Sequence, residues 1–397
     1  MRVKTRMWPG PVLIGLAAAV VMAVPASAAG HRSPPGSSSA TYGSTVVGHV
    51  YVNDNTTGTN TIGAFDRHAD GTLTPEAGSP FDAGGAGTGN GLADQGAIQI
   101  SPDGRYVLAV DAGSNQISVL RIRHDGSLRL VRDGVVSSGG VLPDSIAIHD
   151  DLVYVANSGN GGSNYTGFIL GLGGHLHPLR GSTVTLPDGS AQADVLFNGT
   201  GTKLVGTRVG SSLIDSFTVR ADGLLTAAPG SPIPAQGLGP FGSEFRPTNP
   251  DQLFVSNAHN VGPDTGTVSA YIDAPDGTLT SVAGSPFADD QTAPCWVEIT
   301  HDGRFLFTVN TGSGAISRYS IASSGALRLL GSTPVSATGG VGAVDARLSP
   351  DGRDLYVDES RIGKVGEFAV SGGNLTELPG SPVSLPANAP PAGIATN

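Results

Sequence analysis

Residues 96–131 read GAIQISPDGRYVLAVDAGSNQISVLRIRHDGSLRLV and contain the pattern from which the fold is predicted. It holds four short runs in which apolar and polar residues alternate, separated by Pro-Asp-Gly, by the loop DAGSN and by His-Asp-Gly. Alternation with a period of two indicates β-strands, and Asp-Gly between such runs is a strong signal for a hairpin turn. The stretch therefore predicts four consecutive antiparallel strands of one sheet.

The first strand of this stretch recurs with its turn every 48 to 53 residues. Its copies are Gly96–Gly104, Asp144–Asp151, Ala193–Gly201, Gly242–Asp251, Cys295–Gly303, Val344–Gly352 and, truncated, Ala392–Asn397. A second marker, which starts at the turn before the fourth strand, runs in phase with the first. It begins at Asp70 (DGTLTPEAGSPF), Asp125, Gly173, Asp222, Asp276, Ser324 and Gly372. Seven copies of each marker indicate seven repeats of one four-stranded unit.

Units of this kind close into a ring. A four-stranded sheet cannot bury both of its faces alone, so each unit needs a neighbour on either side. Val46–Asn53 reads as an outer-type strand and Ala392–Asn397 as an innermost-type strand, so the two ends of the chain supply halves of one blade. A solenoid is the alternative, but it would need capping repeats. We therefore predict an all-β, seven-bladed β-propeller of four-stranded blades over residues 45–397, closed by N- and C-terminal strands that share one blade.

The residues before the propeller have a different composition. A basic start and an apolar run precede Ala26-Ser27-Ala28, which is the pattern of a secretory signal peptide. We predict a signal peptide over residues 1–28, cleaved near Ala28, and a flexible linker rich in Ser, Pro and Gly over residues 29–44. The protein is then secreted to the extracellular space. A membrane anchor is the alternative, but the apolar run is short for a bilayer span, and no integral membrane span is expected.

Charge and cysteine content narrow the function classes. The chain has 22 Lys and Arg against 33 Asp and Glu, a net charge of −11, and no basic cluster. Such a chain repels phosphate backbones, so we expect no nucleic acid as a partner. Its one cysteine allows no intrachain disulfide, so packing must stabilise the fold. The sequence does not specify an oligomeric state, and a monomer is the simplest expectation.

Three segments carry a resemblance to a known family: VYVANSGNGG from Val153, LFVSNAHNVG from Leu253 and LFTVNTGSGAISRYSI from Leu306. They resemble the YVTN-type propellers and the bacterial lactonase propellers typified by 6-phosphogluconolactonase and the carboxymuconate-lactonising enzymes. The resemblance covers the chain from the predicted cleavage site onward. It implies the propeller fold and a lactonase-like activity, in which a small lactone or sugar-acid ester is hydrolysed at the rim of the central channel.

The resemblance also implies where catalytic residues would lie. Active relatives place Pro-Arg-His at the start of an innermost strand and a Glu after the second strand that follows. In the last full blade, Val344 and Asp345 stand at the Arg-His positions and Glu359 matches the Glu; no other innermost strand begins with the pair. Two functions therefore stay open, a lactonase-like hydrolase and a non-catalytic propeller that binds a ligand or a protein in the extracellular space or cell envelope.

Alternation along the innermost strands predicts which side chains face the central channel, where we expect a small-molecule ligand. The candidate catalytic residues are Glu359, Glu298 and Asp345, each a possible general base, and Arg347, which would hold an anionic oxygen. The candidate ligand-binding residues are Trp296, Glu244, Asp194, Gln99, Arg208 and His259. The alternative is a charge network of Arg347 with Asp345 and Glu244 that keeps the channel hydrated.

Signals for a cofactor are weak. His175 and His177 lie two residues apart on a predicted outermost strand and share a face, but no third ligand lies near them in the sequence. The Asp-Gly turns lack the downstream ligands of a calcium loop. We therefore predict no cofactor and assign no metal-binding residue, while use of a divalent cation stays open.

Overall fold

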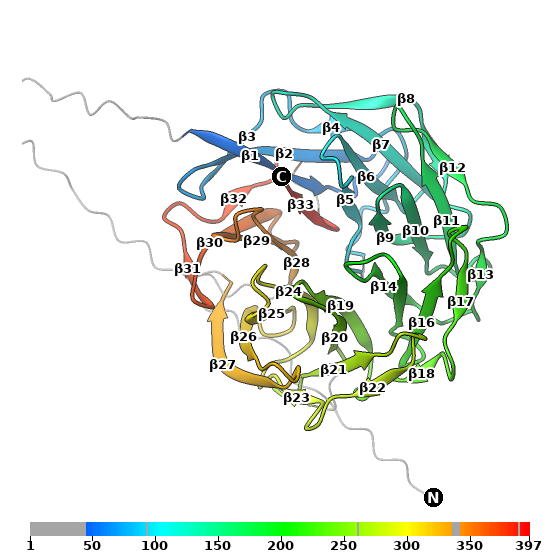
Figure 1. Ribbon diagram of the computed structural model, residues 1–397. Coiled ribbons are helices and arrows are strands. Elements are labelled where there is room, and N and C mark those ends of the chain that lie inside the picture. Colours follow the sequence, from blue (N-terminus) through cyan, green and yellow to red (C-terminus); the bar gives the residue numbers. More distant parts are fainter. Residues whose placement is uncertain (1–44, 93, 260–261, 336–341, 388–389) are drawn as a thin grey trace, which may run out of the picture. The chain divides into compact units, whose positions relative to one another are not determined.

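The computed structural model describes residues 45–92, 94–259, 262–335, 342–387 and 390–397. The predicted signal peptide and linker lie outside the described residues. Every regular element of the described chain is a β-strand, and none of these residues forms a helix long and apolar enough to cross a membrane. The strands form seven antiparallel sheets arranged in a ring, which we number as blades in chain order (Figure 1). The predicted fold class is confirmed.

The first four blades are built as follows. Blade 1 contains β1 (Val46–Asn53), β2 (Thr61–His68), β3 (Leu73–Pro75), β4 (Phe81–Asp82) and, from the other end of the chain, β33 (Ile394–Thr396). Blade 2 contains β5 (Ile98–Ile100), β6 (Tyr106–Asp111), β7 (Gln116–Ile122) and β8 (Leu128–Ser137). Blade 3 contains β9 (Pro143–His149), β10 (Leu152–Asn157), β11 (Asn164–Leu170), β12 (Leu176–Pro178) and β13 (Val184–Thr185). Blade 4 contains β14 (Gln192–Phe197), β15 (Lys203–Arg208), β16 (Leu213–Val219), β17 (Leu225–Ala227) and β18 (Ile233–Pro234).

The last three blades follow the same order from the centre outward. Blade 5 contains β19 (Pro240–Arg246), β20 (Asn249–Asn257), β21 (Thr267–Asp273), β22 (Leu279–Ser281) and β23 (Phe287–Ala288). Blade 6 contains β24 (Pro294–Ile299), β25 (Phe305–Asn310), β26 (Ala315–Ile321) and β27 (Leu327–Pro334). Blade 7 contains β28 (Ala343–Leu348), β29 (Asp354–Glu359), β30 (Lys364–Ser371), β31 (Asn374–Glu377) and β32 (Val383–Ser384).

The two ends of the described chain close the ring. In Figure 1 the red strand β33 lies beside the blue strand β1, and the two pair antiparallel, with Val52 opposite Ile394. The backbone of Asn53 adds two hydrogen bonds, one to Gly393 at 3.0 Å and one from Ala392 at 2.9 Å. The predicted closure is therefore confirmed, with β33 innermost and β1 second in blade 1.

The core is divided among the interfaces between blades. The buried apolar side chains form seven clusters, and each cluster draws mainly on two neighbouring blades. Three tyrosines of second strands also donate a hydrogen bond to the glycine carbonyl of the Asp-Gly or equivalent turn in the next blade: Tyr51 to Gly126, Tyr154 to Gly223 and Tyr356 to Gly71, at 2.9 to 3.0 Å. The turn of the second marker therefore joins blades as well as closing a hairpin.

The outermost strands differ from the prediction of one continuous strand. In blades 1, 3, 4, 5 and 7 two short strands share this position, and both pair with the third strand. Between them a serine hydroxyl accepts a hydrogen bond at 2.8 to 2.9 Å from a backbone N–H of the third strand. These serines are Ser79, Ser182, Ser231, Ser285 and Ser381. The hydroxyl replaces the carbonyl of an unbroken strand, which explains why Gly-Ser recurs in the second marker.

Ser182→Ala is expected to lower the free energy of unfolding by about 1–3 kcal/mol, because it leaves the buried N–H of Gly167 without its acceptor. Chemical denaturation of the variant and the wild type measures this difference. Ser211→Ala, which removes the same hydroxyl from an exposed position, serves as the control. Equal stability of the two variants would contradict the role assigned to the serine.

Candidate functional site

Three of the predicted channel carboxylates bond to the backbone of the neighbouring blade. Asp194 on β14 accepts a hydrogen bond from the Ser243 N–H at 2.8 Å, and Glu298 on β24 accepts one from the Leu348 N–H at 3.1 Å. Asp345 on β28 accepts one from the Ile394 N–H at 3.3 Å. An innermost strand has an edge without a further strand to pair with, so these carboxylates satisfy N–H groups that the sheets leave open.

Glu298 also holds the one arginine of the predicted catalytic set. Its Oε2 lies 3.2 Å from Nη1 of Arg347, and the two side chains are 9% and 23% exposed. Burial disfavours the charged form of Arg347. The negative charges of Glu298, Asp345 and Glu244 outweigh this effect and raise the pKa of the guanidinium. Arg347 therefore stays a cation and can donate hydrogen bonds to an anionic oxygen of a ligand.

Glu244 on β19 is the second acid beside Arg347 and, unlike Glu298, is partly exposed. Burial raises its pKa well above the usual range, and repulsion from Glu298 raises it further, against the attraction of Arg347. Burial also raises the pKa of Glu298, although the adjacent Arg347 opposes the shift. The two glutamates on neighbouring strands therefore differ in environment, and Glu298 is the one with a bound cation.

A segment that the sequence analysis did not select lies inside the ring. Asp94 and Gln95 precede β5 of blade 2, yet they bond to blades 4, 5 and 6. The Gln95 N–H donates to the Ala193 carbonyl at 2.7 Å, and its side-chain amide donates to the Ser243 carbonyl at 2.9 Å. Trp296 Nε1 donates to the Asp94 carbonyl at 2.5 Å. Asp94–Gln95 therefore fills the centre of the ring where the innermost strands begin.

Side-chain exposure along the innermost strands agrees with this placement. Near their starts, Ser145, Asp194, Ser243, Trp296 and Asp345 are at most 4% exposed. Further along, Gln99, Glu244 and Arg347 are partly exposed. Among the described residues, the part of the channel wall that a ligand can reach therefore lies toward the ends of the innermost strands. The family resemblance implied catalytic residues at the starts of these strands, which is the end where Asp94–Gln95 lies.

Five aspartates gather at the filled end: Asp94, Asp144, Asp194, Asp345 and Asp358. Burial raises the pKa of all five, to about 7 for Asp194 and about 6 for Asp345. The other four aspartates add repulsion that raises the pKa of Asp94 further, and neither carboxylate oxygen of Asp94 has a hydrogen-bond partner in the described structure. A signal for the segment existed in the sequence, since Asp94-Gln95-Gly96 stands where several other innermost strands begin with proline.

The remaining predicted residues lie apart from Glu244, Glu298 and Arg347. The Trp296 ring is enclosed and packs edge-on against Phe241 at 5.1 Å between ring centres. Arg208 makes a bidentate ion pair with Asp215 inside blade 4, with Nε 2.6 Å from Oδ2. Glu359 is 1% exposed at the end of β29, and His259 is exposed on the loop after β20.

Comparison with known proteins places the chain in a family. The model of a lactonase family described as a seven-bladed β-propeller matches residues 49–165 and 245–379. A proposed 6-phosphogluconolactonase from Bacteroides fragilis is 19% identical with a TM-score of 0.70, over 88% of this chain and 98% of that one. The periplasmic gluconolactonase PpgL of Pseudomonas aeruginosa is 18% identical with a TM-score of 0.67, over 88% and 98%.

At these identities the solved structures support the fold alone, and no curated relative matches the sequence. The match to the family model carries more weight than these structures, because it spans well over half of the chain. It includes blades on both sides of blade 1, the blade that closes the ring. Together with the seven blades, it shows that the chain belongs to the lactonase family of seven-bladed β-propellers.

Proposed function

We propose that this protein hydrolyses an uncharged lactone in the part of the channel lined by Glu244, Glu298 and Arg347. The observation that carries the proposal is the pairing of one partly exposed arginine with two acids in different environments. Two titratable groups whose surroundings move their pKa values apart are the usual basis of acid–base catalysis. Membership of the lactonase family supports lactone chemistry as the reaction class.

Lactone hydrolysis adds water to the ester carbonyl and breaks the ring C–O bond. The Arg347 guanidinium would stabilise the negative charge that develops on the carbonyl oxygen. Glu298, the acid paired with this cation, would take the proton from the attacking water. Glu244, whose pKa is raised well above the usual range, would donate a proton to the ring oxygen as the bond breaks, which leaves an open-chain hydroxy acid.

The charge of the channel favours a neutral substrate. Asp194, Glu244, Glu298 and Asp345 surround one arginine, and the whole chain carries a net charge of −11. A substrate with a phosphate group would meet this negative field on its approach. We infer that a sugar lactone without phosphate is the preferred class, and gluconolactone is a suitable first compound.

Acid release from gluconolactone, measured at constant pH and corrected for spontaneous hydrolysis, tests the proposal. We expect the wild type to hydrolyse gluconolactone faster than its 6-phosphorylated form. Glu244→Gln should lower kcat/KM by about 100-fold, the size of a general acid–base contribution. Arg347→Met should lower it by about 100-fold or more, as loss of an oxyanion donor does.

Glu377→Gln, on the outermost strand β31, removes a carboxylate far from the innermost strands and should leave the rate unchanged. Turnover that survives both Glu244→Gln and Arg347→Met would exclude these residues as the catalytic group.

A second candidate function is ligand binding without catalysis. It is favoured by Val344 and Asp345, which stand where active relatives carry Arg-His, and by the backbone bonds that already engage Asp194, Glu298 and Asp345. Saturable binding of a sugar lactone without turnover, weakened by Arg347→Met, would support this function over hydrolysis. In both cases the predicted signal peptide supports action outside the cell.

A further inference from the structure

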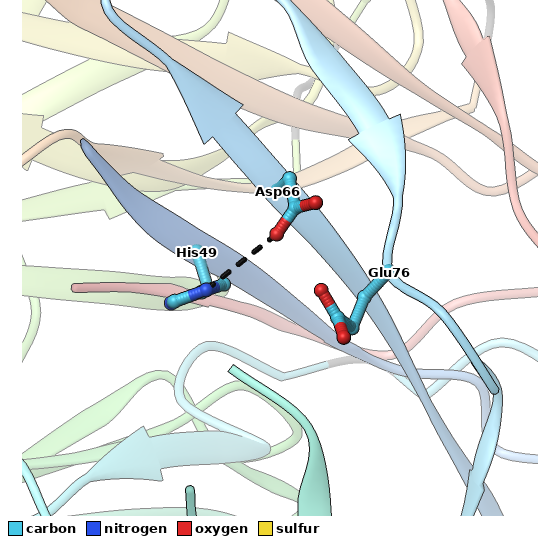
Figure 2. Close-up of side chains that lie close together, drawn as sticks. All are labelled: His49, Asp66 and Glu76. Carbon is cyan, nitrogen blue, oxygen red and sulfur yellow. Dashed lines mark ion pairs between the residues drawn. The ribbon is translucent and has the colours of Figure 1, made fainter. Parts of the chain in front are cut away.

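Three side chains of metal-binding type lie together in blade 1, outside the channel. His49 on β1 stands directly opposite Asp66 on β2, and Glu76 follows β3. Figure 2 shows the two carboxyl groups and the imidazole gathered around one space beside the sheet. One ligand atom from each residue lies within 4.8 Å of the others, and His49 Nε2 lies 3.6 Å from Asp66 Oδ1. The strand register therefore brings together residues that are up to 27 positions apart in the sequence.

The imidazole is held from its other side. Asn397 Oδ1 accepts a hydrogen bond from the His49 backbone N–H at 2.8 Å and lies 3.3 Å from His49 Nδ1. A proton on Nδ1 completes this contact and leaves the lone pair of Nε2 facing Asp66. Metal-binding histidines are commonly oriented in this way by an oxygen acceptor on their second nitrogen.

Close packing fixes the same ring. The Tyr51 ring lies roughly parallel to it at 6.1 Å between centres. A Cβ atom on Gly126 of blade 2 would lie 2.0 Å from His49 Cδ2, so the glycine allows the turn to pack directly on the imidazole. The histidine is therefore prepositioned before any ligand binds.

The two carboxyl groups lie in an environment that favours a cation. Glu76 is 8% exposed, and a carboxylate oxygen of Glu76 lies within 4.8 Å of one of Asp66, so two acidic groups share a confined space. A divalent ion between Asp66 and Glu76 would turn their repulsion into attraction. The group borders a cleft of about 850 Å³ between blades 1 and 2, whose wall also includes Arg105 and Arg123.

We propose that His49, Asp66 and Glu76 bind a divalent transition-metal ion, with Zn²⁺ as the best match, and leave one coordination position open to the cleft. One imidazole nitrogen with two carboxylates suits Zn²⁺, whereas Ca²⁺ takes six to eight oxygen ligands. Tetrahedral zinc with bonds of about 2.0–2.2 Å places its ligand atoms about 3.4 Å apart, close to the 3.6 Å between His49 and Asp66. Water or an anionic group from the cleft would complete the shell.

Metal binding to the full chain, purified without a histidine tag and stripped with a chelator, tests the site. Titration calorimetry is expected to show one Zn²⁺ per chain, with Mg²⁺ and Ca²⁺ binding at least 100-fold more weakly. Asp66→Asn and Glu76→Gln should each weaken Zn²⁺ binding by at least 100-fold. Asn397→Ala should weaken it by about 10–100-fold through the orientation of His49. His175→Ala, at an outermost strand of blade 3, should have no effect.

Two further measurements guard against misfolded variants. Zn²⁺ should raise the melting temperature of the wild type but not of Asp66→Asn or Glu76→Gln, while the metal-free proteins melt alike. Bound Co²⁺ should give the visible absorption of a low-coordinate site. No stoichiometric zinc binding, tighter binding of Ca²⁺ than Zn²⁺, or zinc affinity that survives the Asp66→Asn/Glu76→Gln double variant would overturn the proposal. None of these readouts depends on lactone turnover.

Discussion

Ile394→Asp is expected to lower the free energy of unfolding by more than about 4 kcal/mol. Ile394 is fully buried on β33, opposite Val52 of β1, and packs in the cluster that joins blades 7 and 1. The substitution removes this packing and buries a charge without a cation beside it, which together cost several kcal/mol. Because no disulfide links the two ends of the described chain, the pairing of β33 with β1 is what joins them in blade 1.

Chemical denaturation followed by circular dichroism measures the effect. Thr376→Asp adds the same charge to an exposed position of β31 and should leave the midpoint nearly unchanged. If Ile394→Asp unfolded at the denaturant concentration of the wild type, the closing strand would contribute little to stability, and the ring would have to be held by the other interfaces alone.

Stability is expected to fall as the pH rises from 5 to 8. The pKa of Asp194 is raised to about 7 and that of Asp345 to about 6, whereas an aspartate in an unfolded chain has a pKa of about 3.9. Between these values the folded protein holds protons that the unfolded chain releases, so each rise in pH favours unfolding. A group such as Asp194 would cost about 2 kcal/mol between pH 5 and pH 7.

Asp94→Asn provides the matched variant for this prediction. Asp94 is 1% exposed and faces four other aspartates, with no hydrogen-bond partner on its carboxylate oxygens in the described chain. Replacing it with a neutral side chain of the same shape should raise the melting temperature at pH 8 and flatten its dependence on pH. A wild-type melting temperature that increases from pH 5 to pH 8 would show that the aspartates are not protonated in the folded ring.

The fold could be predicted because each repeat carries its own local signals. Alternation specifies the strands, Asp-Gly the hairpins, and the truncated copy Ala392–Asn397 the closure. The division of the outermost strands was harder to predict, since Gly-Ser-Pro reads as the end of a strand. Only the structure shows that the Ser182 hydroxyl, like its equivalents, continues the hydrogen bonding across the break.

The candidate site was predictable where it follows the repeat. The alternation placed Glu298 and Arg347 on the channel side of neighbouring innermost strands, 49 residues apart. The predicted charge network paired Arg347 with Asp345 and Glu244, whereas the structure pairs it with Glu298. Gln95 contacts Ser243, 148 residues further along the chain, through the path of a single loop. This contact does not follow the repeat, so the repeat could not predict it. His49, Asp66 and Glu76 also escaped the sequence analysis, because they meet only through the register of three strands of one blade.

The Asp94–Gln95 segment has a kinetic consequence for anything bound beyond it. The segment bonds to three blades where their innermost strands begin, so it stands in the path of a ligand at that end of the ring. A reactant and its product would then use the same mouth, and the product must leave before the next molecule can enter. The product should therefore act as a competitive inhibitor. Slow release of the product would set the upper limit of the turnover rate.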